Sequence, residues 1–183
     1  MRNILKSMLV LVIALLVVSG SVFAQKNRGI RGGWMESDIS KGGESYFNSK
    51  YKAFYVGMFN DQKLIPMLYI YTALDYYQTG SKYNDDNKLI LHYISIPVGL
   101  KLKIGPVQAF GGVHGAVKVS TTYTLLAQPV SSEKFSTFDA GTFIGLGLSI
   151  AFIGAEVKYT KGLVDINRGY KNNFWQAELT LWF

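Results

Sequence analysis

Hydrophobic and polar residues alternate one by one along most of this chain. The last segment shows the pattern best: an apolar residue stands at every second position from Trp175 to Phe183, and Gln176, Glu178 and Thr180 stand between them. A period of two places successive side chains on opposite faces of a β-strand. The pattern therefore predicts strands with one uniform apolar face and one mixed face.

Eight segments of this kind follow one another along the chain: 29–38, 51–60, 64–78, 88–104, 107–120, 139–151, 154–163 and 173–183. The connections are alternately long (39–50, 79–87, 121–138 and 164–172) and short (60–63, 105–106 and 152–153). Barrels that cross the bacterial outer membrane have an even number of strands, short periplasmic turns and longer outer loops. The sequence therefore predicts an all-β fold, an eight-stranded antiparallel transmembrane β-barrel of up-and-down topology.

The character of the two faces favours lipid on the outside. In 139–151 the apolar face is entirely aliphatic, from Ile144 to Ile150, whereas the other face mixes glycines with Phe143. A uniform aliphatic face suits lipid, and a mixed face suits a narrow, filled interior. A soluble periplasmic lipocalin-like barrel, with its apolar face inward, is the architectural alternative. Pro66 fits a strand start, and Pro97, in the middle of a strand, predicts a bulge.

The first 24 residues have the three parts of a secretory signal peptide. Arg2 and Lys6 form a basic start, residues 8–18 are an unbroken apolar run, and Ala24 ends a stretch of small and apolar residues. The apolar run is too short for a membrane-spanning helix. We therefore expect 1–24 to be a cleaved signal peptide and 25–183 to be the barrel domain, exported to the outer membrane of a Gram-negative cell.

Composition narrows the chemistry. The 183 residues are 49% hydrophobic and 17% charged and include no Cys. This excludes intrinsic disorder, disulfides, thiolate nucleophiles and Cys-ligated zinc or iron–sulfur sites. The net charge of +7 comes from scattered residues, so nucleic acid is not an expected partner. Contact with acidic groups of lipopolysaccharide is expected instead, through Lys41, Lys50, Lys52, Lys82 and Lys134.

The polar face carries charges that a barrel would point inward. These residues are Arg31, Asp75, Lys101, Lys103, His114, Lys118, Glu156, Lys158 and Glu178. We interpret them as a structural network of ion pairs, because charges buried without partners are strongly unfavourable. A small ion or solute channel is the functional alternative, although an eight-stranded interior is only just wide enough for its own side chains.

A lipid-modifying enzyme is a further alternative, and its only candidate set is Ser95, His114 and Asp75. The turn at 105–106 predicts that His114 lies near Pro97, and therefore near Ser95. The long connection 79–87 predicts that Asp75 lies opposite Leu91, over 10 Å from Ser95 at about 3.4 Å per residue. We therefore expect no catalytic triad, no enzyme activity, no cofactor and no metal. The pair Asp85–Asp86 is typical of a loop turn, with surface Ca²⁺ binding as a weaker hypothesis.

Several segments carry a family resemblance. They are Gly29–Gly33, Ala53–Phe59, Tyr93–Lys101, Gly111–Gly115 and Phe143–Gly147, in order over the whole chain after the signal segment. In these the chain resembles the PorT-like outer membrane protein β-barrel family of Bacteroidota, which usually carries Glu where this chain has Ser95. The resemblance implies an outer-membrane location and no single activity. A role in type IX secretion belongs to PorT itself and is not transferred.

The C-terminal end resembles the terminal strand of bacterial outer-membrane barrels. Phe183, Leu181 and Leu179 match the signal that the barrel assembly machinery recognises. The partners implied are this machinery and the lipid and lipopolysaccharide of the outer membrane. An extracellular or envelope protein that binds the outer loops, above all 121–138, is a further hypothesis.

Overall fold

The computed structural model describes residues 27–41, 44–45, 49–82, 88–124, 136–166 and 169–183. The expected signal peptide 1–24, the pair Asp85–Asp86, Lys134 and most of the connection 121–138 lie outside the described residues. Within the described part of the chain, no helix is long and apolar enough to cross a membrane.

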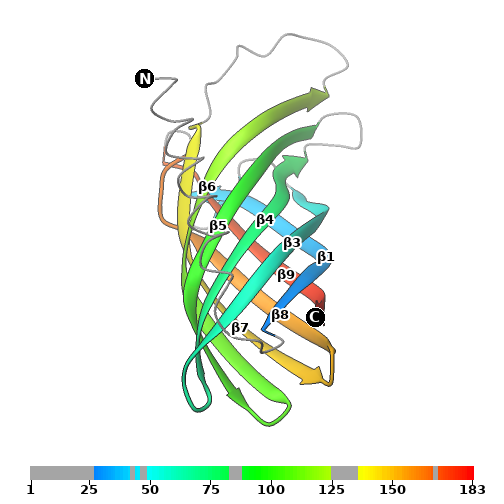
Figure 1. The fold of residues 1–183 in the computed structure, drawn as a ribbon. Coiled ribbons are helices and arrows are strands. Elements are labelled where there is room, and N and C mark those ends of the chain that lie inside the picture. The colour runs from blue at the N-terminus through cyan, green and yellow to red at the C-terminus, as the bar shows by residue number, and fades with distance from the viewer. Residues whose placement is uncertain (1–26, 42–43, 46–48, 83–87, 125–135, 167–168) are drawn as a thin grey trace.

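The described residues form one closed antiparallel barrel (Figure 1). Its strands are β1 (Arg28–Lys41), β3 (Ser49–Ile65), β4 (Leu68–Lys82), β5 (Lys88–Ile104), β6 (Val107–Thr124), β7 (Phe138–Ile150), β8 (Ile153–Gly162) and β9 (Lys171–Trp182). Each strand pairs with the next along the chain, and β9 pairs with β1 to close the barrel. The short β2 (Glu44–Ser45) folds back on the end of β1. The predicted eight-stranded antiparallel transmembrane barrel is confirmed.

The barrel has two different ends. We call the end with the connections at Pro66–Met67, 105–106 and 151–152 the turn end, and the opposite end the loop end. The backbone N–H of Trp182 donates to the carbonyl oxygen of Phe152 at 2.9 Å, and that of Phe183 donates to Arg28 at 2.9 Å. The first and last strands of the barrel therefore meet at the turn end.

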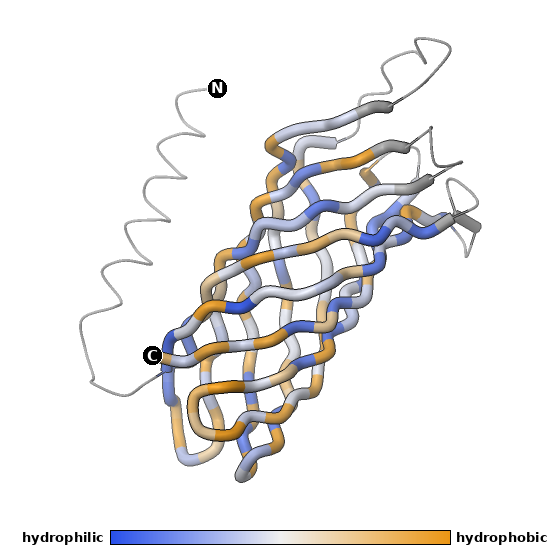
Figure 2. The backbone as a smooth tube through the Cα atoms, turned by 90° about the vertical axis from the view of Figure 1, so that its right-hand side faces the viewer, coloured by the Kyte–Doolittle hydropathy of each residue, from blue (hydrophilic) through white to orange (hydrophobic). Residues whose placement is uncertain are grey.

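Hydrophobic and hydrophilic residues alternate along the strands (Figure 2), and the apolar ones point outward. Ile144 is 68% exposed and Ile150 is 76% exposed, whereas Glu156 and Arg31 are each only 2% exposed. An outward aliphatic face is the arrangement of a barrel whose solvent is lipid. The soluble lipocalin-like alternative, which needs the apolar face inside, is therefore wrong.

The first short turn lies elsewhere than expected. β3 runs past 60–63 to Ile65, and the turn is Pro66–Met67. Proline fixes φ near the value that a turn needs at its second position, and Met67 follows with φ of 71°. The expected turn at 60–63 is wrong because these polar residues belong to β3, which continues to Ile65. Asp61 consequently points inward and is fully buried.

Pro97 does not produce the expected bulge. The β4–β5 pairing keeps one register on both sides of Pro97, so only ladder contacts opposite the proline are interrupted. The irregularity in β5 and β6 lies instead between His92 and Tyr93, where β6 carries one extra residue, Val119. A bulge of this kind shifts the following residues by one face, and Ser120 is accordingly exposed.

The interior is filled in two layers. Near the loop end, a hydrophobic cluster of aromatic and aliphatic side chains includes Tyr55, Tyr77, Tyr93 and Phe174. Towards the turn end, a second cluster contains Phe59, Tyr71, Ala73, Phe110, Phe143 and Trp182. The charged side chains lie among these rings, so the barrel core is packed rather than hollow.

Candidate functional site: the charged interior and the outer surface

Arg31 on β1 is the centre of a buried group of four charges. Its guanidinium donates to both carboxylate oxygens of Asp75, at 2.8 and 2.6 Å, and to the hydroxyl of Tyr71. Glu178 lies 3.5 Å from the guanidinium, and the ammonium of Lys158 lies 3.8 Å from Asp75. We call these four charged residues the Arg31 group. Two positive and two negative charges make it neutral, which is the condition for burying ions.

A second neutral group lies nearer the turn end. The Lys101 ammonium donates to Glu156 at 3.0 Å and lies 3.4 Å from Asp61. Lys103 lies 2.8 Å from the same Asp61 carboxylate. We call these four residues the Lys101 group. Its lysines also face aromatic rings, with Lys101 4.7 Å from the ring centre of Tyr71, a contact that favours a desolvated cation.

Tyr71 links the two groups. Its ring centre lies 5.2 Å from the Arg31 guanidinium and 4.7 Å from the Lys101 ammonium, and its hydroxyl accepts from Arg31. Gly57 makes room for this arrangement, because a Cβ there would overlap the Asp75 carboxylate. The geometry brings together six of the nine residues predicted for the interior: Arg31, Asp75, Lys101, Glu156, Lys158 and Glu178. A seventh predicted residue, Lys103, lies at the edge of the Lys101 group.

The two remaining predicted residues lie nearer the loop end. His114 is buried and stands edge-on to Phe174, with ring centres 6.1 Å apart. Lys118 lies on the inward face of β6 and is partly buried. Neither belongs to the Arg31 group or the Lys101 group as the structure describes them.

The predicted register between β4 and β5 is wrong. β4 extends to Lys82, so Asp75 lies directly opposite Ser95 rather than opposite Leu91. His114 lies opposite Pro97, as predicted. Asp75, Ser95 and His114 are therefore near one another. However, both Asp75 oxygens accept hydrogen bonds from Arg31, and Ser95 is only 2% exposed inside the barrel. Asp75 is therefore engaged by Arg31 and not available to orient His114, and Ser95 is not accessible to lipid outside the barrel.

The outer half of the interior holds a further polar contact that the sequence did not reveal. The Asn172 side-chain amide donates to Asp139 at 2.7 Å across the intervening strand. A side chain at Gly162, which lies between them, would overlap the backbone of Asn172. Ile166, from the connection after β8, is buried and belongs to the hydrophobic cluster near the loop end.

Sequence reasoning also missed Asp61 and Tyr71. A signal for Asp61 was present, since the inward positions of β3 continue in step from Tyr51 through Phe59 to Asp61. For Tyr71 no signal was available, because an aromatic residue on a mixed face does not reveal that its hydroxyl contacts an arginine. Among the described residues, no three His, Asp or Glu side chains are placed to hold one metal ion.

The outer surface changes character near the loop end. Trp34 and Phe54 are both exposed, lie opposite each other on β1 and β3, and have ring centres 5.7 Å apart. One step closer to the loop end, Glu36 lies opposite Lys52, and Lys50 donates to Glu36 at 2.8 Å. Rings followed by charges mark the edge of the lipid-facing band.

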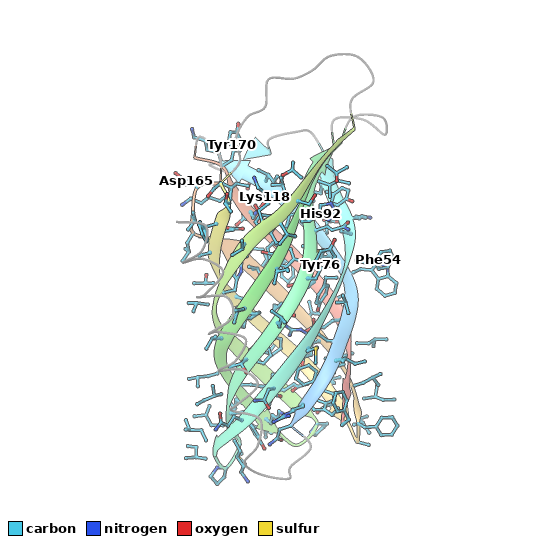
Figure 3. The ribbon with its side chains drawn as sticks, turned by 45° about the horizontal axis from the view of Figure 1, so that its top comes forward. Phe54, Tyr76, His92, Lys118, Asp165 and Tyr170 are labelled. Carbon is cyan, nitrogen blue, oxygen red and sulfur yellow. The ribbon has the colours of Figure 1, made fainter. Side chains whose placement is uncertain are left out.

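A polar contact continues this edge onto the neighbouring strands. The hydroxyl of Tyr76 and Nδ1 of His92 are 2.8 Å apart, and His92 Nε2 lies 3.2 Å from the Thr122 hydroxyl. Figure 3 shows Tyr76 and His92 close together, and Phe54 projecting away from the barrel. His92 therefore points outward near the loop end.

The predicted assembly residues lie on the outer face at the turn end. Leu179, Leu181 and Phe183 are 61%, 43% and 63% exposed. They are therefore accessible on the outer surface of the seam where β9 pairs with β1.

Comparisons with known proteins agree with this architecture. A family model described as "Outer membrane protein beta-barrel domain" matches residues 23–168. The chain is similar to the solved structure of Ail, the attachment invasion locus protein of Yersinia pestis, in complex with the heparin analogue sucrose octasulfate. Their identity is 13% and the TM-score 0.54, over 86% of this chain and 98% of Ail.

The chain is also similar to the solved structure of Neisserial surface protein A, at 13% identity and a TM-score of 0.59 over 85% of this chain and 97% of that protein. These two likenesses show the fold. No curated protein sequence matches the chain. Because the family model spans most of the chain, and the apolar face points outward as a membrane barrel requires, the protein is an integral outer-membrane β-barrel that belongs to the outer membrane protein β-barrel domain family.

Proposed function

We propose that this barrel is a non-catalytic scaffold that presents its outer loops and its rim to lipopolysaccharide and to surface partners. The observation that supports this most directly is the Arg31 group, whose guanidinium has no exposed surface and whose four charges cancel. A catalytic or transport site needs a group that substrate can reach. The charged groups of the Arg31 group are buried and contact one another instead. The interior network is therefore proposed to be structural.

A small channel is the second candidate, and one observation favours it. In the described part of the interior, both side-chain atoms of Gln108, the Thr180 hydroxyl and Nε1 of Trp182 are buried without a hydrogen-bond partner in the protein. Such atoms are compatible with water inside the turn end of the barrel. The hydroxyls of Tyr55 and Tyr77, in the cluster near the loop end, are likewise without a partner, but the Tyr77 ring there is packed against other aromatic rings.

Planar-bilayer recording separates the two candidates. We expect the purified, folded barrel to give no discrete conductance steps. Regular steps that depend on the amount of protein would instead assign a small channel. The enzyme alternative is tested by the mass profile of lipid A in cells that overexpress the protein. We expect this profile to be unchanged.

The proposed surface role is tested through the loop end. Intact cells carrying the protein are treated with a cross-linker, and the recovered partners are compared with those of a variant in which 125–135 is replaced by a short Gly-Ser linker. We expect this replacement to remove the partner without reducing the amount of folded barrel. An identical set of partners from both strains would contradict a role for this loop.

Three further proposals concern export and family. We propose cleavage after Ala24, which the mass of the mature protein tests, and recognition of Phe183 by the assembly machinery, for which Phe183→Ala should lower the folded fraction. The five segments between Gly29 and Gly147 support a place in the PorT-like group.

A further inference from the structure

A carboxylate on the inner face of β7 has no positive charge beside it among the described residues. Asp139 is 3% exposed, and its Oδ2 atom accepts a hydrogen bond from Asn172 at 2.7 Å, whereas its Oδ1 atom is buried without a partner. None of the ion pairs between described residues includes Asp139. A buried carboxylate is strongly unfavourable unless a proton or a cation neutralises it.

The other inward carboxylates of the described strands are all neutralised by the chain itself. The two in the Arg31 group face two basic side chains, and so do the two in the Lys101 group. Both groups are therefore neutral, which identifies charge balance as the rule of this interior. By that rule, Asp139 needs one positive charge, and the described side chains do not supply it.

Three further oxygen atoms around Asp139 are buried without a hydrogen-bond partner. They are Oδ1 of Asn172 and the hydroxyl oxygens of Tyr77 and Tyr93. The Asp139 carboxylate is close enough to act electrostatically on both hydroxyls, and Tyr93 lies beside the Asn172 side chain. Tyr77 and Tyr93 are opposite each other on β4 and β5, and their stacked rings have centres 5.5 Å apart. The carboxylate thus has carbonyl and hydroxyl oxygens around it.

Oxygen ligands with a single negative charge suit a hard monovalent cation. Carbonyl and carboxylate oxygens bind Na⁺, K⁺, Mg²⁺ and Ca²⁺, whereas transition metals favour imidazole or thiolate ligands. A divalent ion would leave this buried place with an excess positive charge. The described residues also offer no cluster of three His, Asp or Glu side chains that could hold a metal ion, so a divalent ion would lack its usual carboxylates.

We propose that Asp139, Asn172, Tyr77 and Tyr93 bind one monovalent metal cation, Na⁺ or K⁺, inside the loop end of the barrel. Their oxygen atoms are the ligands, and the ion supplies the charge that Asp139 needs. The site goes beyond the proposed surface role, which conductance and loop-dependent partners test independently of any ion.

The site also explains how an ion affects the loop end. The residue after Asp139, Ala140, accepts a backbone hydrogen bond from Leu163 at 2.8 Å, at the start of the connection after β8. Further along this connection, the carbonyl oxygen of Ile166 accepts from Ser136 at 2.7 Å. An ion on Asp139 therefore stabilises the strand end to which this connection is bonded.

Urea unfolding of the barrel in phosphatidylcholine vesicles tests the site. NaCl or KCl is varied while N-methyl-D-glucamine chloride, whose cation is too large for the site, keeps the ionic strength constant. Because only the folded protein binds the ion, the unfolding midpoint should rise with the concentration of Na⁺ or K⁺. The ion that acts at the lower concentration is the one the site takes. A midpoint that responds to neither ion would overturn the inference.

Substitution of the carboxylate gives a result that a purely structural residue would not. Asp139→Asn should abolish the response to Na⁺ and K⁺, and without these ions it should be at least as stable as the native barrel, because a lone buried charge is gone. Asp75→Asn is the matched control. It also removes an inward carboxylate, but one that Arg31 already holds, so it should lower the midpoint and keep the response.

Tyr93→Phe and Asn172→Ala remove single oxygen ligands. Each should raise the ion concentration needed for half of the effect about tenfold, which is the lower end of the loss seen when supporting groups of a metal site are removed. An unchanged ion response in both variants would contradict the assigned ligands.

Asn172→Asp tests the charge balance. Two carboxylates side by side need two positive charges, so this variant should respond to Ca²⁺ at lower concentrations than to Na⁺ or K⁺. Asn173→Asp is the control, because Asn173 is the next residue of β9 and lies on its other face. A Ca²⁺ response of the same size in both variants, or in neither, would contradict charge balance at this site.

Two basic side chains of the chain are the competing sources of the charge. Lys118 lies on the inward face of β6 opposite Tyr93, at the loop end, as Figure 3 shows. Arg168 follows Ile166 by two residues and lies outside the described residues. We expect Lys118→Gln and Arg168→Gln to keep the ion response of the native barrel. An unresponsive native barrel, together with a lowered midpoint in one of these variants, would assign the charge to that side chain and overturn the inference.

Discussion

Arg31 is the residue on which most of the interior contacts converge. Its guanidinium contacts Asp75, Glu178 and Tyr71, and none of these groups reaches solvent. In water each charge would be well solvated, so their burial is stable only as a set. The consequence is an asymmetry: removing one charge should be worse than removing two.

Asp75→Asn should therefore destabilise the barrel strongly. The substitution preserves shape but leaves two positive charges, Arg31 and Lys158, against one negative charge, Glu178, within the Arg31 group. Breaking a buried pair in this way costs about 3–5 kcal/mol. Urea unfolding of the barrel in lipid vesicles, followed by tryptophan fluorescence, measures the difference in the free energy of unfolding.

The double variant Arg31→Met with Asp75→Leu is the decisive comparison. It keeps the interior neutral, because Lys158 and Glu178 remain, and it should be more stable than Asp75→Asn alone. Glu36→Gln, at the exposed edge, should leave stability unchanged. A double variant that is less stable than the single one would show that shape, not charge balance, governs this site.

At the scale of the elements, the backbones of β1 and β9 approach each other closely at the seam that closes the barrel. A Cβ at Gly33 would overlap the carbonyl oxygen of Ala177 and lie 2.7 Å from the Cα of Glu178. These are backbone atoms of the strand that closes the barrel, so they cannot turn aside as a side chain would.

We therefore expect Gly33→Ala to lower the folded yield of the barrel, as the loss of heat-modifiable mobility after refolding. Gly32→Ala is the neighbouring control, since its Cβ makes only an ordinary contact on the outer face. If both variants refold equally well, the close approach at the seam does not limit closure.

The turn Pro66–Met67 holds a residue in a strained conformation. Met67 has φ of 71°, and left-handed backbone costs an ordinary residue about 1–2 kcal/mol. Met67→Gly should relieve this, with a net gain of about 0.5–1 kcal/mol after the extra flexibility of glycine in the unfolded chain. Met67→Val should lose stability. Urea unfolding measures both, and an order with Val above Gly would contradict the assigned turn.

The same turn shows what the sequence could and could not reveal. Alternation predicts the number of strands, their order and the face on which each residue lies, because burial enforces a strict period of two. It does not predict where a hairpin turns, since the polar run at 60–63 reads equally well as a turn or as strand. The register follows from the turn, so Asp75 was placed opposite Leu91 although it lies opposite Ser95.

The interior site was accessible to prediction only in part, for the same reason. Inward charges were found by parity alone, because lipid forbids them on the other face. Which inward charges pair depends on the strand register and on space such as that left at Gly57. The sequence contains many glycines and does not show which of them leaves room for a charged side chain. Asp61 was assigned to the expected turn at 60–63 and was therefore not predicted to point inward. As a result, the Lys101 group was not predicted as a neutral group.

At the scale of the whole molecule, charge inside and aliphatic residues outside define a protein whose solvent is the bilayer. Among the described strands, the pairing of β9 with β1 joins the two edges that an open sheet would expose to lipid. The two ends then differ only in their connections: short turns at one, longer loops at the other. This difference makes a prediction about orientation that needs no partner or ligand.

The absence of Cys makes this orientation directly measurable. The chain has no native thiol, so each introduced cysteine reports alone. Asp165→Cys, at the loop end with 59% of its side chain exposed, should react in intact cells with a polyethylene-glycol maleimide too large to enter porins. Met67→Cys, 55% exposed at the turn end, should react only after the outer membrane is permeabilised. Ala53→Cys, inside the barrel and 7% exposed, is the control and should react only after heating. Labelling of Met67→Cys in intact cells would place the turns outside and invert the orientation.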